Sequence, residues 1–317
     1  MRLLLAILPV LALVQPSAAQ TLDRPARRAV IESTARLIES RYVSPEWGPR
    51  IARALRGQAD RFTETDPVAF AGSLTGYLRK VSNDGHFSVA HRSMPPDAAA
   101  ADSLDSSAEL ERWYGAGVNH GFEAVRRLEG GVGYLDLRAF APTGMAGDMA
   151  AAAMTLLAQS PALIIDLRQN GGGMGDMVEL LAAYILDKPT EISGTYDRPT
   201  DRHTRSFTPS WVPGRRFGGT KPVFILISRR TFSAAEAFAY DMQAAGRARI
   251  IGERSGGGAH PFAYRAIDDR FVLSLPEGRS INPVTGRDWE GTGVVPDVES
   301  RADDALSVAL KLATAAR

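Results

Sequence analysis

Short unbroken apolar runs alternate with helical patterns in the second half of the chain. The run from Val223 to Ile227 is typical of a strand buried on both faces of a sheet. Apolar residues then recur at helical spacing, which predicts a helix from Ser233 to about Gly246. The run from Ala162 to Leu167 predicts another buried strand, and a helix is predicted from Asp176 to Leu186. Strands that alternate with helices indicate an α/β fold.

The first part of the chain has a helical pattern instead. Apolar positions between Arg24 and Phe62 predict two helices joined by a turn, and a third helix is predicted from Pro67 to Val81. The turn-forming residues Ser82 to His86 follow. Alternation from Phe87 to His91 then predicts a short strand.

The remaining segments are less regular. Residues Arg92 to Arg112 are rich in alanine, serine and aspartate, which is typical of a mobile connector. Many polar residues, prolines and glycines from Thr190 to Gly219 predict a long surface loop near the site. The other predicted elements are strands at Gly115 to Val118, Gly121 to Leu128 and Gly133 to Arg138, a second short strand at Arg249 to Gly252, a hairpin-like region around Phe271 to Pro283, and helices at Gly147 to Ala158 and Asp303 to Ala315.

The N-terminal residues predict export. An apolar run from Leu3 to Val14 is followed by the small residues Ser17-Ala18-Ala19, which is the pattern of a signal peptide over residues 1–19. The run is too short for a spanning helix, and no later run is long enough to cross a bilayer. We therefore expect a periplasmic or extracellular protein with no integral membrane segment after cleavage.

Composition excludes several functional classes. The chain has 317 residues, of which 44% are hydrophobic, so it has enough apolar surface for a large core. It has no cysteine, which excludes disulfides and thiol chemistry. The formal net charge is only +1, with basic residues dispersed along the chain, so no nucleic-acid partner is predicted.

The sequence contains no motif for a bound cofactor. A dinucleotide-binding G-x-G-x-x-G starting at Gly171 would need glycine in place of Asp176, and the lysine of the Walker pattern is missing. There is no H-E-x-x-H motif and no histidine pair at helical spacing. We therefore predict no nucleotide, no metal ion and no other cofactor.

A glycine loop follows the buried strand that ends at Leu167. Residues Gly171-Gly172-Gly173 form a row of backbone amides at the carboxyl end of this strand. Such amides suit an oxyanion hole. A tight turn in which only glycine fits the backbone is an equally good interpretation of the loop alone.

Ser233 lies between the second buried strand and its helix. A helix N-terminus offers free amides to a developing negative charge, so this serine is a candidate nucleophile. Residues Ser233 to Glu236 also spell the capping box, in which the serine hydroxyl accepts a backbone N–H and the glutamate reaches back. Taken alone, this stretch favours the capping role.

A serine nucleophile needs a base within hydrogen-bond reach. No lysine lies between Pro222 and Leu310, and arginine stays protonated, so histidine is the candidate base. His86 follows a turn at the start of a predicted strand and is the first choice, and His260 beside a glycine-rich loop is the alternative. The other histidines are His91, His120 and His203, of which His203 is expected to be exposed to solvent.

Four ordered segments together carry a family pattern. They are DLRQNGGG from Asp166, TFSAAE from Thr231, GERSGGGAHP from Gly252 and WEGTGVVPD from Trp289. The chain thereby resembles the tail-specific, or C-terminal processing, serine peptidase family, and is most similar to the branch that includes the tricorn core protease and the interphotoreceptor retinoid-binding protein repeats. This resemblance implies an α/β fold with a ClpP/crotonase-like sheet-and-helix core, preceded by a small helical N-terminal segment.

The resemblance also implies roles for individual residues. Ser233 matches the nucleophile, and the amides of Gly173 and Ala234 match the oxyanion hole. The tricorn-like branch uses a histidine and a glutamate, and the residues that resemble them here are His86 and Glu290. The resemblance implies that His86 is the base and that Glu290 orients its ring.

Two positions depart from the family pattern. The processing peptidases proper use a serine–lysine dyad, and Gly258 stands here at the position of that lysine. The tricorn protease has a serine immediately before its histidine, where this chain has Gly85. Both departures affect the groups around the proposed base.

The implied function is an exported serine peptidase that acts on peptides or unfolded proteins. The alternative is a catalytically inactive binding module for apolar ligands or peptides, because the retinoid-binding branch uses this fold to carry apolar ligands. The retained serine, histidine and glutamate favour the peptidase, since a pure binder does not need the set.

The expected organisation is a signal peptide at residues 1–19, a helical N-terminal segment at 20–86, a connector at 87–112 and an α/β peptidase core at 113–317. The processing peptidases commonly insert a PDZ domain between the histidine region and the core. The segment from Phe87 to Gly131 is too short to hold one. We therefore expect substrate tails to be captured without a PDZ domain.

Overall fold

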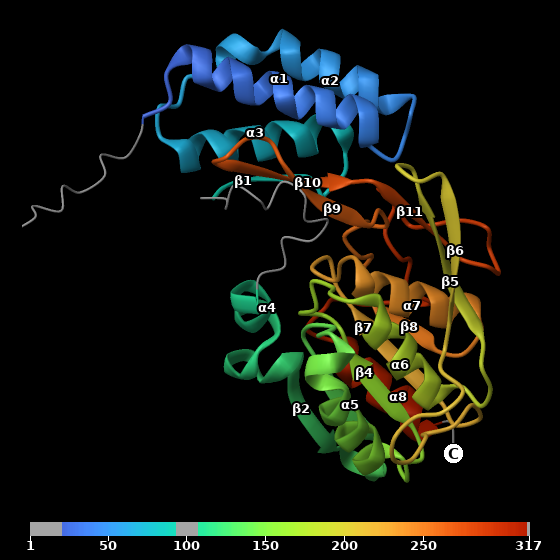
Figure 1. Ribbon diagram of the computed structural model, residues 1–317. Coiled ribbons are helices and arrows are strands. Elements are labelled where there is room, and N and C mark those ends of the chain that lie inside the picture. The colour runs from blue at the N-terminus through green and yellow to red at the C-terminus, as the bar shows by residue number, and fades with distance from the viewer. Residues whose placement is uncertain (1–20, 93–106, 316–317) are drawn as a thin grey trace, which may run out of the picture.

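The computed structural model describes residues 21–92 and 107–315. Figure 1 shows a layer of helices above a larger α/β body, with strands from the C-terminal part of the chain between them. The predicted signal peptide and residues 93–106 of the predicted connector lie outside the described residues.

A six-stranded sheet forms the centre of the α/β body, in the order β12-β8-β7-β4-β3-β2. All neighbouring strands are parallel except β3 and β2, which are antiparallel. The strands are β2 (Phe122–Arg127), β3 (Gly133–Leu137), β4 (Leu163–Asp166), β7 (Val223–Ile227), β8 (Arg249–Gly252) and β12 (Val298–Glu299). The predicted α/β core is therefore confirmed.

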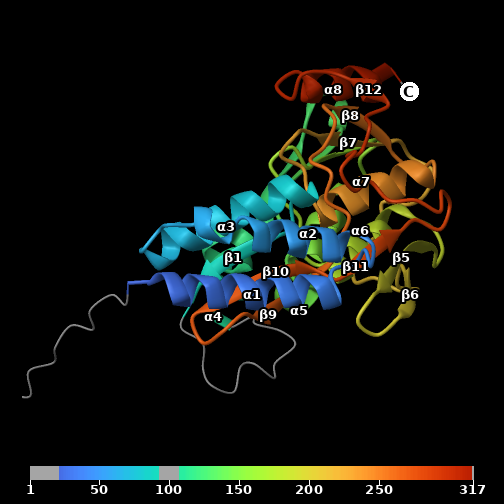
Figure 2. The same ribbon diagram turned by 90° about the horizontal axis from the view of Figure 1, so that it is seen from above.

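Helices cover both faces of this sheet. On one face lie α5 (Thr143–Leu157), α6 (Gly175–Ile185) and α7 (Ala234–Ala244), and on the other lies α8 (Ala305–Ala315). Figure 2 shows α8 on the opposite side of the sheet from α5 and α6. Alternate residues of β7 therefore enter two cores: Ile225 packs with the first group of helices and Leu226 with α8. This two-sided burial explains the unbroken apolar runs.

The N-terminal helices α1 (Arg24–Arg41), α2 (Trp47–Gly57) and α3 (Pro67–Ser82) form the upper layer, as predicted. Asp23 and Asp66 cap α1 and α3 by accepting backbone N–H groups, and each helix has a proline in its first turn. No helix in the described ranges is long and apolar enough to cross a membrane.

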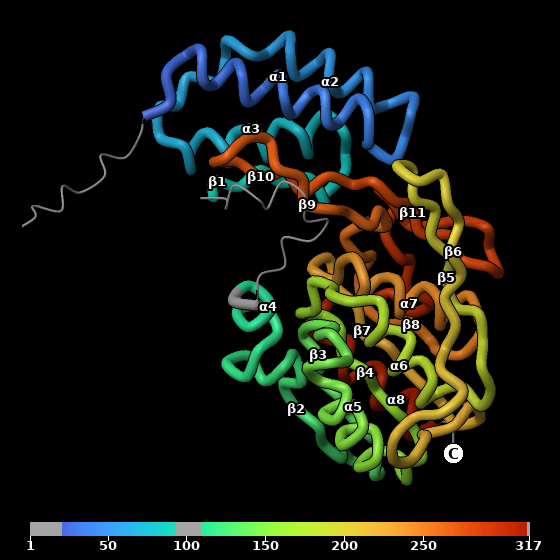
Figure 3. Tube along the Cα trace, in the orientation of Figure 1, coloured from blue at the N-terminus to red at the C-terminus, as the bar shows by residue number. Residues whose placement is uncertain are grey.

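The helical layer packs against strands that come from both ends of the chain. The antiparallel sheet β1-β10-β9 joins β1 (Ser88–His91) to β10 (Phe271–Pro276) and β9 (Phe262–Ala266). The three helices share one hydrophobic core with Phe271, Leu273 and Leu275. Figure 3 shows the orange segment that contains β10 beneath the blue and cyan helices. Residues near the end of the chain therefore complete the hydrophobic core of the three N-terminal helices.

The prediction of a long surface loop at residues 190–219 is wrong in part. The segment contains β5 (Glu191–Asp197) and β6 (Arg202–Phe207). β5 pairs with both β6 and β11 (Gly278–Ile281) in a second three-stranded sheet. Almost every residue of β6 is exposed, so the ribbon has no apolar alternation to reveal it.

Two further expectations are wrong. The region Phe271 to Pro283 is not a hairpin, because β10 and β11 belong to different sheets. The predicted strand Gly115 to Val118 is instead part of a helical turn, Ala116–Gly121, that follows helix α4 (Ser107–Tyr114). The Val118 and His120 N–H groups both donate to the Gly115 carbonyl, at 3.2 and 3.1 Å, so this segment forms local turn bonds in place of strand pairing.

The junction of the helical layer with β10 yields a stability prediction. Phe271 is fully buried, and its ring centroid lies 5.8 Å from that of Phe70 in α3. We expect Phe271→Ala to lower the free energy of unfolding by about 3–5 kcal/mol, because the cavity opens in a core that two chain segments share. Urea denaturation followed by circular dichroism measures this. Val284→Ala, at a side chain that is 66% exposed, is the control and should change it by less than about 0.5 kcal/mol. An equal effect of the two variants would contradict the prediction.

Candidate active site

Ser233 occupies the tight turn between β7 and α7. Its backbone has φ 54° and ψ −122°, an unusual conformation for a residue with a side chain. Neighbouring bonds enforce the turn, since the Phe232 N–H donates to the Asn170 carbonyl at 3.1 Å and the Thr231 hydroxyl donates to the Leu167 carbonyl at 2.8 Å. The serine is thus held rigidly against the loop that follows β4.

His86 reaches this serine from the helical layer. Its Nε2 lies 3.1 Å from the Ser233 hydroxyl oxygen. The His86 carbonyl accepts a hydrogen bond from the Ser274 hydroxyl of β10 at 2.9 Å, which anchors the histidine to the strand between the two bodies. Burial lowers the pKa of His86 to about 4, so the imidazole is neutral at neutral pH and Nε2 is available to accept the serine proton.

The imidazole of His86 is enclosed by two aromatic rings. The centroid of Phe232 is 4.7 Å away and that of Phe262 is 5.5 Å away. A Cβ atom at Gly258 would lie 2.2 Å from Phe232 and 2.8 Å from His86, and one at Gly85 would lie 2.8 Å from Phe232. The histidine site therefore excludes side chains at both positions where the chain departs from its family pattern, including the lysine of the dyad.

The glycine loop after β4 lies directly against Ser233. Gly172 and Gly173 have φ angles of 111° and 139°, which favour glycine. A Cβ at Gly172 would lie 2.8 Å from the Ser233 Cβ and 3.1 Å from the Ala234 nitrogen. Ala234 begins α7, where an amide has no acceptor within the helix. The structure thus brings the loop with Gly173 beside the Ala234 amide.

Asn170 holds this loop in place. The side chain is fully buried, donates to the Leu137 carbonyl at 2.9 Å and accepts the Gly172 N–H at 2.8 Å. Its own carbonyl accepts the Phe232 N–H, so one residue ties β3, the glycine loop and the serine turn together. The sequence contained this asparagine within a family segment but gave no sign of its role.

Glu236 is a functional residue that the capping-box interpretation underrated. It accepts the Ser233 N–H at 2.9 Å, as the box requires. It also accepts the Gly257 and Gly258 N–H groups at 2.7 and 2.8 Å and the Ser255 hydroxyl at 2.5 Å. Burial raises its pKa, although these donors favour the ionised form. One buried carboxyl therefore joins the serine turn to the loop beside His86.

Glu290 lies near His86 but is bonded elsewhere. Its Oε2 accepts the Ala259 N–H at 2.5 Å and lies 3.6 Å from His260 Nδ1. Burial, together with the charge of Asp84, raises the pKa of Glu290 to about 7. The preceding Trp289 is buried and donates from Nε1 to the Gly258 carbonyl at 2.8 Å, which fixes the position of this segment.

Asp84 is a second carboxylate that the sequence interpretation treated only as a turn former. It is buried, it accepts the His260 Nδ1–H at 2.7 Å, and it accepts the Tyr42 hydroxyl at 3.3 Å. Side-chain atoms of Asp84, His86 and Glu290 all lie within 4.8 Å of one another. Among the described residues, this is the one group of three or more acidic or imidazole side chains spaced to hold a metal ion. We call Asp84, His86, His260 and Glu290 the buried cluster.

The predicted histidines thus divide into different roles. His86 contacts Ser233, whereas His260 contacts the two carboxylates behind it. His203 is exposed on β6, as expected. His260 also stays protonated to a higher pH than an ordinary histidine. Burial lowers its pKa, but Asp84 and Glu290 raise it by more.

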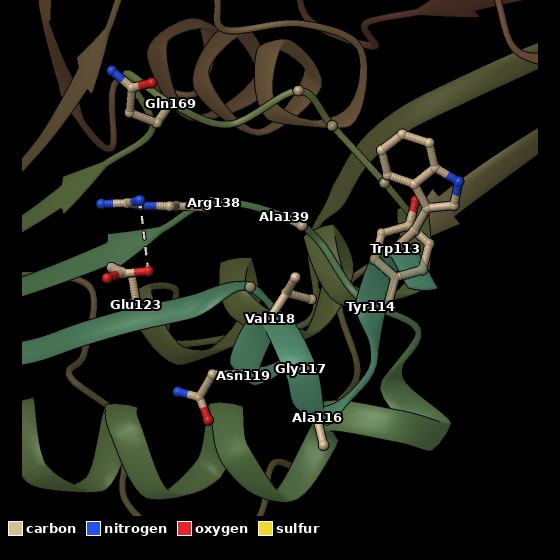
Figure 4. Close-up of a pocket in the computed structure, with 14 residues that line it drawn as sticks. Trp113, Tyr114, Ala116, Gly117, Val118, Asn119, Glu123, Arg138, Ala139 and Gln169 are labelled. Carbon is tan, nitrogen blue, oxygen red and sulfur yellow. Dashed lines mark ion pairs between the residues drawn. The ribbon is translucent and has the colours of Figure 1, made fainter. Parts of the chain in front are cut away.

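A cavity of about 710 Å³ opens beside the glycine loop. Its lining includes Gly171 to Gly173 on one side and Trp113, Val118 and Arg138 on the others. Figure 4 shows the Arg138–Glu123 ion pair at one end and Trp113 at the other. The cavity therefore combines exposed apolar surface with charged groups next to the serine turn.

Comparisons with known proteins agree with this fold. A family model described as Peptidase family S41 matches residues 131–300. The chain is 28% identical over 180 residues to a carboxy-terminal-processing protease of Bartonella bacilliformis, in a match covering 54% of this chain and 39% of that protein. It is 32% identical over 121 residues to a tail-specific protease of Haemophilus influenzae, covering 38% of this chain and 16% of that protein. The matches thus span less than half of either relative.

Solved structures show the same fold at low sequence identity. The photosystem II D1 C-terminal processing protease has a TM-score of 0.53 and 17% identity, covering 88% of this chain and 94% of its own. A lipoprotein from Streptococcus agalactiae has a TM-score of 0.59 and 15% identity, covering 91% of this chain and 96% of its own. The predicted core architecture with a helical N-terminal segment is thereby confirmed.

The aromatic enclosure of His86 predicts how Gly258 tolerates substitution. Gly258→Ala should lower the free energy of unfolding by about 1–3 kcal/mol, because the new methyl group overlaps the Phe232 ring. Urea denaturation measures the loss, and the same change in a Phe232→Leu background should cost at least about 0.5 kcal/mol less. Gly76→Ala is the matched control: no atom lies within 4 Å of its Cβ in α3, so it should be neutral or stabilising. Equal costs in the two backgrounds would contradict the aromatic contact as the cause.

Proposed function

The chain belongs to peptidase family S41, and we propose that it is an exported serine peptidase that hydrolyses peptide bonds with Ser233 as nucleophile and His86 as general base. The observation that carries this proposal is the 3.1 Å separation between His86 Nε2 and the Ser233 hydroxyl oxygen. At that distance the two groups form a hydrogen bond, which transfer of the serine proton to His86 requires.

In the first step, the Ser233 oxygen attacks the carbonyl carbon of the peptide while its proton passes to His86 Nε2. The tetrahedral intermediate then loses the amine, which takes the proton from His86, and an acyl ester remains on Ser233. Water attacks this ester while its proton passes to His86 Nε2. The bond between the acyl carbon and the Ser233 oxygen then breaks, His86 returns the proton to that oxygen, and the acid product leaves. Burial lowers the pKa of His86 to about 4, so its imidazole is unprotonated before attack.

We assign the oxyanion hole to the backbone amides of Gly173 and Ala234. Charge develops on the carbonyl oxygen in the tetrahedral intermediate, and preorganised N–H donors stabilise it. The close approach of the glycine loop to the start of α7 supports this assignment. The strained backbone of Ser233 also supports it, because the turn presents the side chain and the next amide together.

Glu290 belongs to the proposed site as a carboxylate behind His86. Its place within the buried cluster supports this role. No step of the proposed reaction passes through a metal ion or another cofactor.

We propose that the cavity beside the glycine loop receives part of a peptide or unfolded protein substrate. Its contact with Gly173 supports this, because a chain bound there would lead directly to the oxyanion hole. Its apolar and charged lining suits side chains and backbone alike.

The domain organisation and the location are also proposals. We infer a signal peptide at residues 1–19, a helical N-terminal segment at 20–86, a connector at 87–112 and a peptidase core at 113–317 without a PDZ domain. The apolar leader with its small-x-small site supports export to the periplasm or the medium.

The nucleophile and base have a direct test. Ser233→Ala and His86→Ala should each lower hydrolysis of fluorescein-labelled casein by at least about 10³-fold, because the two groups act as a unit. Ser307→Ala, at an exposed position on α8, is the control and should keep full activity. Hydrolysis that persists in purified Ser233→Ala protein would overturn the assignment.

The same proteins separate the peptidase from a binding module on this fold. A fluorophosphonate should label Ser233 in the folded wild type, with the adduct located by mass spectrometry, and should not label the folded His86→Ala variant. An unlabelled Ser233 in folded wild-type protein would favour the non-catalytic binding module.

The cavity generates a second prediction. Trp113→Ala should lower kcat/KM for labelled casein by about 10-fold, because a large apolar contact is lost. The rate of modification by diisopropyl fluorophosphate, which is too small to fill the cavity, should change by less than about 2-fold. Trp211→Ala is the matched control, since Trp211 is 72% exposed and does not line the cavity. A parallel fall of both rates would indicate a structural defect instead of lost substrate contact.

A further inference from the structure

One ring nitrogen of His86 is buried without a partner. Nε2 faces Ser233, whereas Nδ1 makes no hydrogen bond within the described part of the chain. The side chain of His86 is only 4% exposed, so bulk water does not satisfy this nitrogen. A neutral histidine that accepts the serine proton must carry its own proton on Nδ1. The site therefore needs an acceptor at that position.

Two carboxylates are near enough to serve as that acceptor. Asp84 Oδ1 lies 3.7 Å from His86 Nδ1. Glu290 directs Oε2 toward the Ala259 N–H and His260, and its Oε1 is buried without a partner among the described residues. Asp84 is thus the carboxylate within ion-pair distance of Nδ1, whereas a Glu290 oxygen lies within 4.8 Å of a His86 ring nitrogen.

The backbone holds Asp84 in register with the histidine. The His86 N–H donates to Asp84 Oδ1 at 3.0 Å, so the carboxylate and the imidazole belong to one turn. Gly85 between them has no side chain, and the Phe232 ring leaves no room for one. A polar residue at position 85 therefore does not mediate between the imidazole and a distant carboxylate.

The other oxygen of Asp84 is held by two donors from different segments. Oδ2 accepts His260 Nδ1–H at 2.7 Å and the Tyr42 hydroxyl at 3.3 Å. Tyr42 is itself stacked on Phe87, with ring centroids 5.2 Å apart. These contacts leave Oδ1 as the oxygen that faces the catalytic imidazole.

We propose that Asp84, rather than Glu290, is the positioning residue that orients His86, and that His260 holds Asp84 in place. The proposal rests on the proposed roles of Ser233 and His86. The negative charge of Asp84 Oδ1, 3.7 Å from Nδ1, attracts the Nδ1–H and favours the tautomer in which Nε2 receives the serine proton. It also stabilises the imidazolium that forms after transfer, while no proton passes to Asp84 itself.

The charges around His86 predict a distinct response to each substitution. Burial lowers the pKa of His86, the charge of Asp84 raises it, and the charges of His260 and Arg79 lower it. Asp84→Asn should therefore lower the pKa of His86 further, and His260→Gln should raise it. If Asp84 only stabilised the fold, these substitutions would not shift the pKa of His86 in opposite directions.

The experiment measures the modification of Ser233 by diisopropyl fluorophosphate as a function of pH, for wild type and the three variants. Asp84→Asn should lower the maximal rate by about 10³-fold with little change in the half-saturating concentration, because the asparagine amide donates to Nδ1 and favours the wrong tautomer. His260→Gln keeps a donor to Asp84 and should cost about 10–100-fold. Glu290→Gln should cost less than Asp84→Asn, and a larger loss from Glu290→Gln would overturn the proposal.

An independent measurement covers the case in which a variant is inactive for other reasons. Heteronuclear NMR of His86, assigned by its loss in His86→Gln, follows the titration in folded protein without any reaction. A fall of the His86 pKa in Asp84→Asn supports the proposal, and an unchanged pKa overturns it. If the wild type reacts with neither casein nor fluorophosphonate, the proposed function fails, while this titration still decides whether Asp84 orients His86.

Discussion

The contact between His86 and Ser233 depends on two separate hydrophobic cores being held in register. Ser233 is fixed by the sheet body, and His86 belongs to the helical layer. Strand β10 joins them, because it pairs with β1 beside His86 and packs its apolar side chains under the N-terminal helices. A 3.1 Å hydrogen bond between two bodies tolerates little displacement, so this contact depends on the packing of β10.

A second constraint acts at shorter range, around the Phe232 ring. This ring supports the imidazole and also occupies the space in which side chains at Gly85, Gly256 or Gly258 would lie. Glu236 fixes the loop that carries two of these glycines through hydrogen bonds to its backbone. A lysine side chain at position 258 and the present positions of Phe232 and His86 therefore exclude each other.

Much of the fold was predictable because its central strands are buried on both faces and therefore unbroken in apolar character. β5 and β6 were not predictable in this way, since an exposed polar ribbon has no apolar period. Ser233 and His86 were singled out from local motifs together with the family resemblance. Asp84 was missed because its side-chain partner His260 lies 176 positions further along the chain, and a turn-forming role already explained its presence. Glu236 was underrated for the same reason, because a helix cap accounted for it locally.

The dependence of the helical layer on β10 has a consequence for the order in which the protein matures. Residues 22–89 leave the ribosome long before Phe271, Leu273 and Leu275, which complete their core. Contacts between such distant segments form late, because closure of the long intervening loop costs entropy before any contact compensates for it. His86 thus reaches Ser233 only after nearly the whole chain has been made.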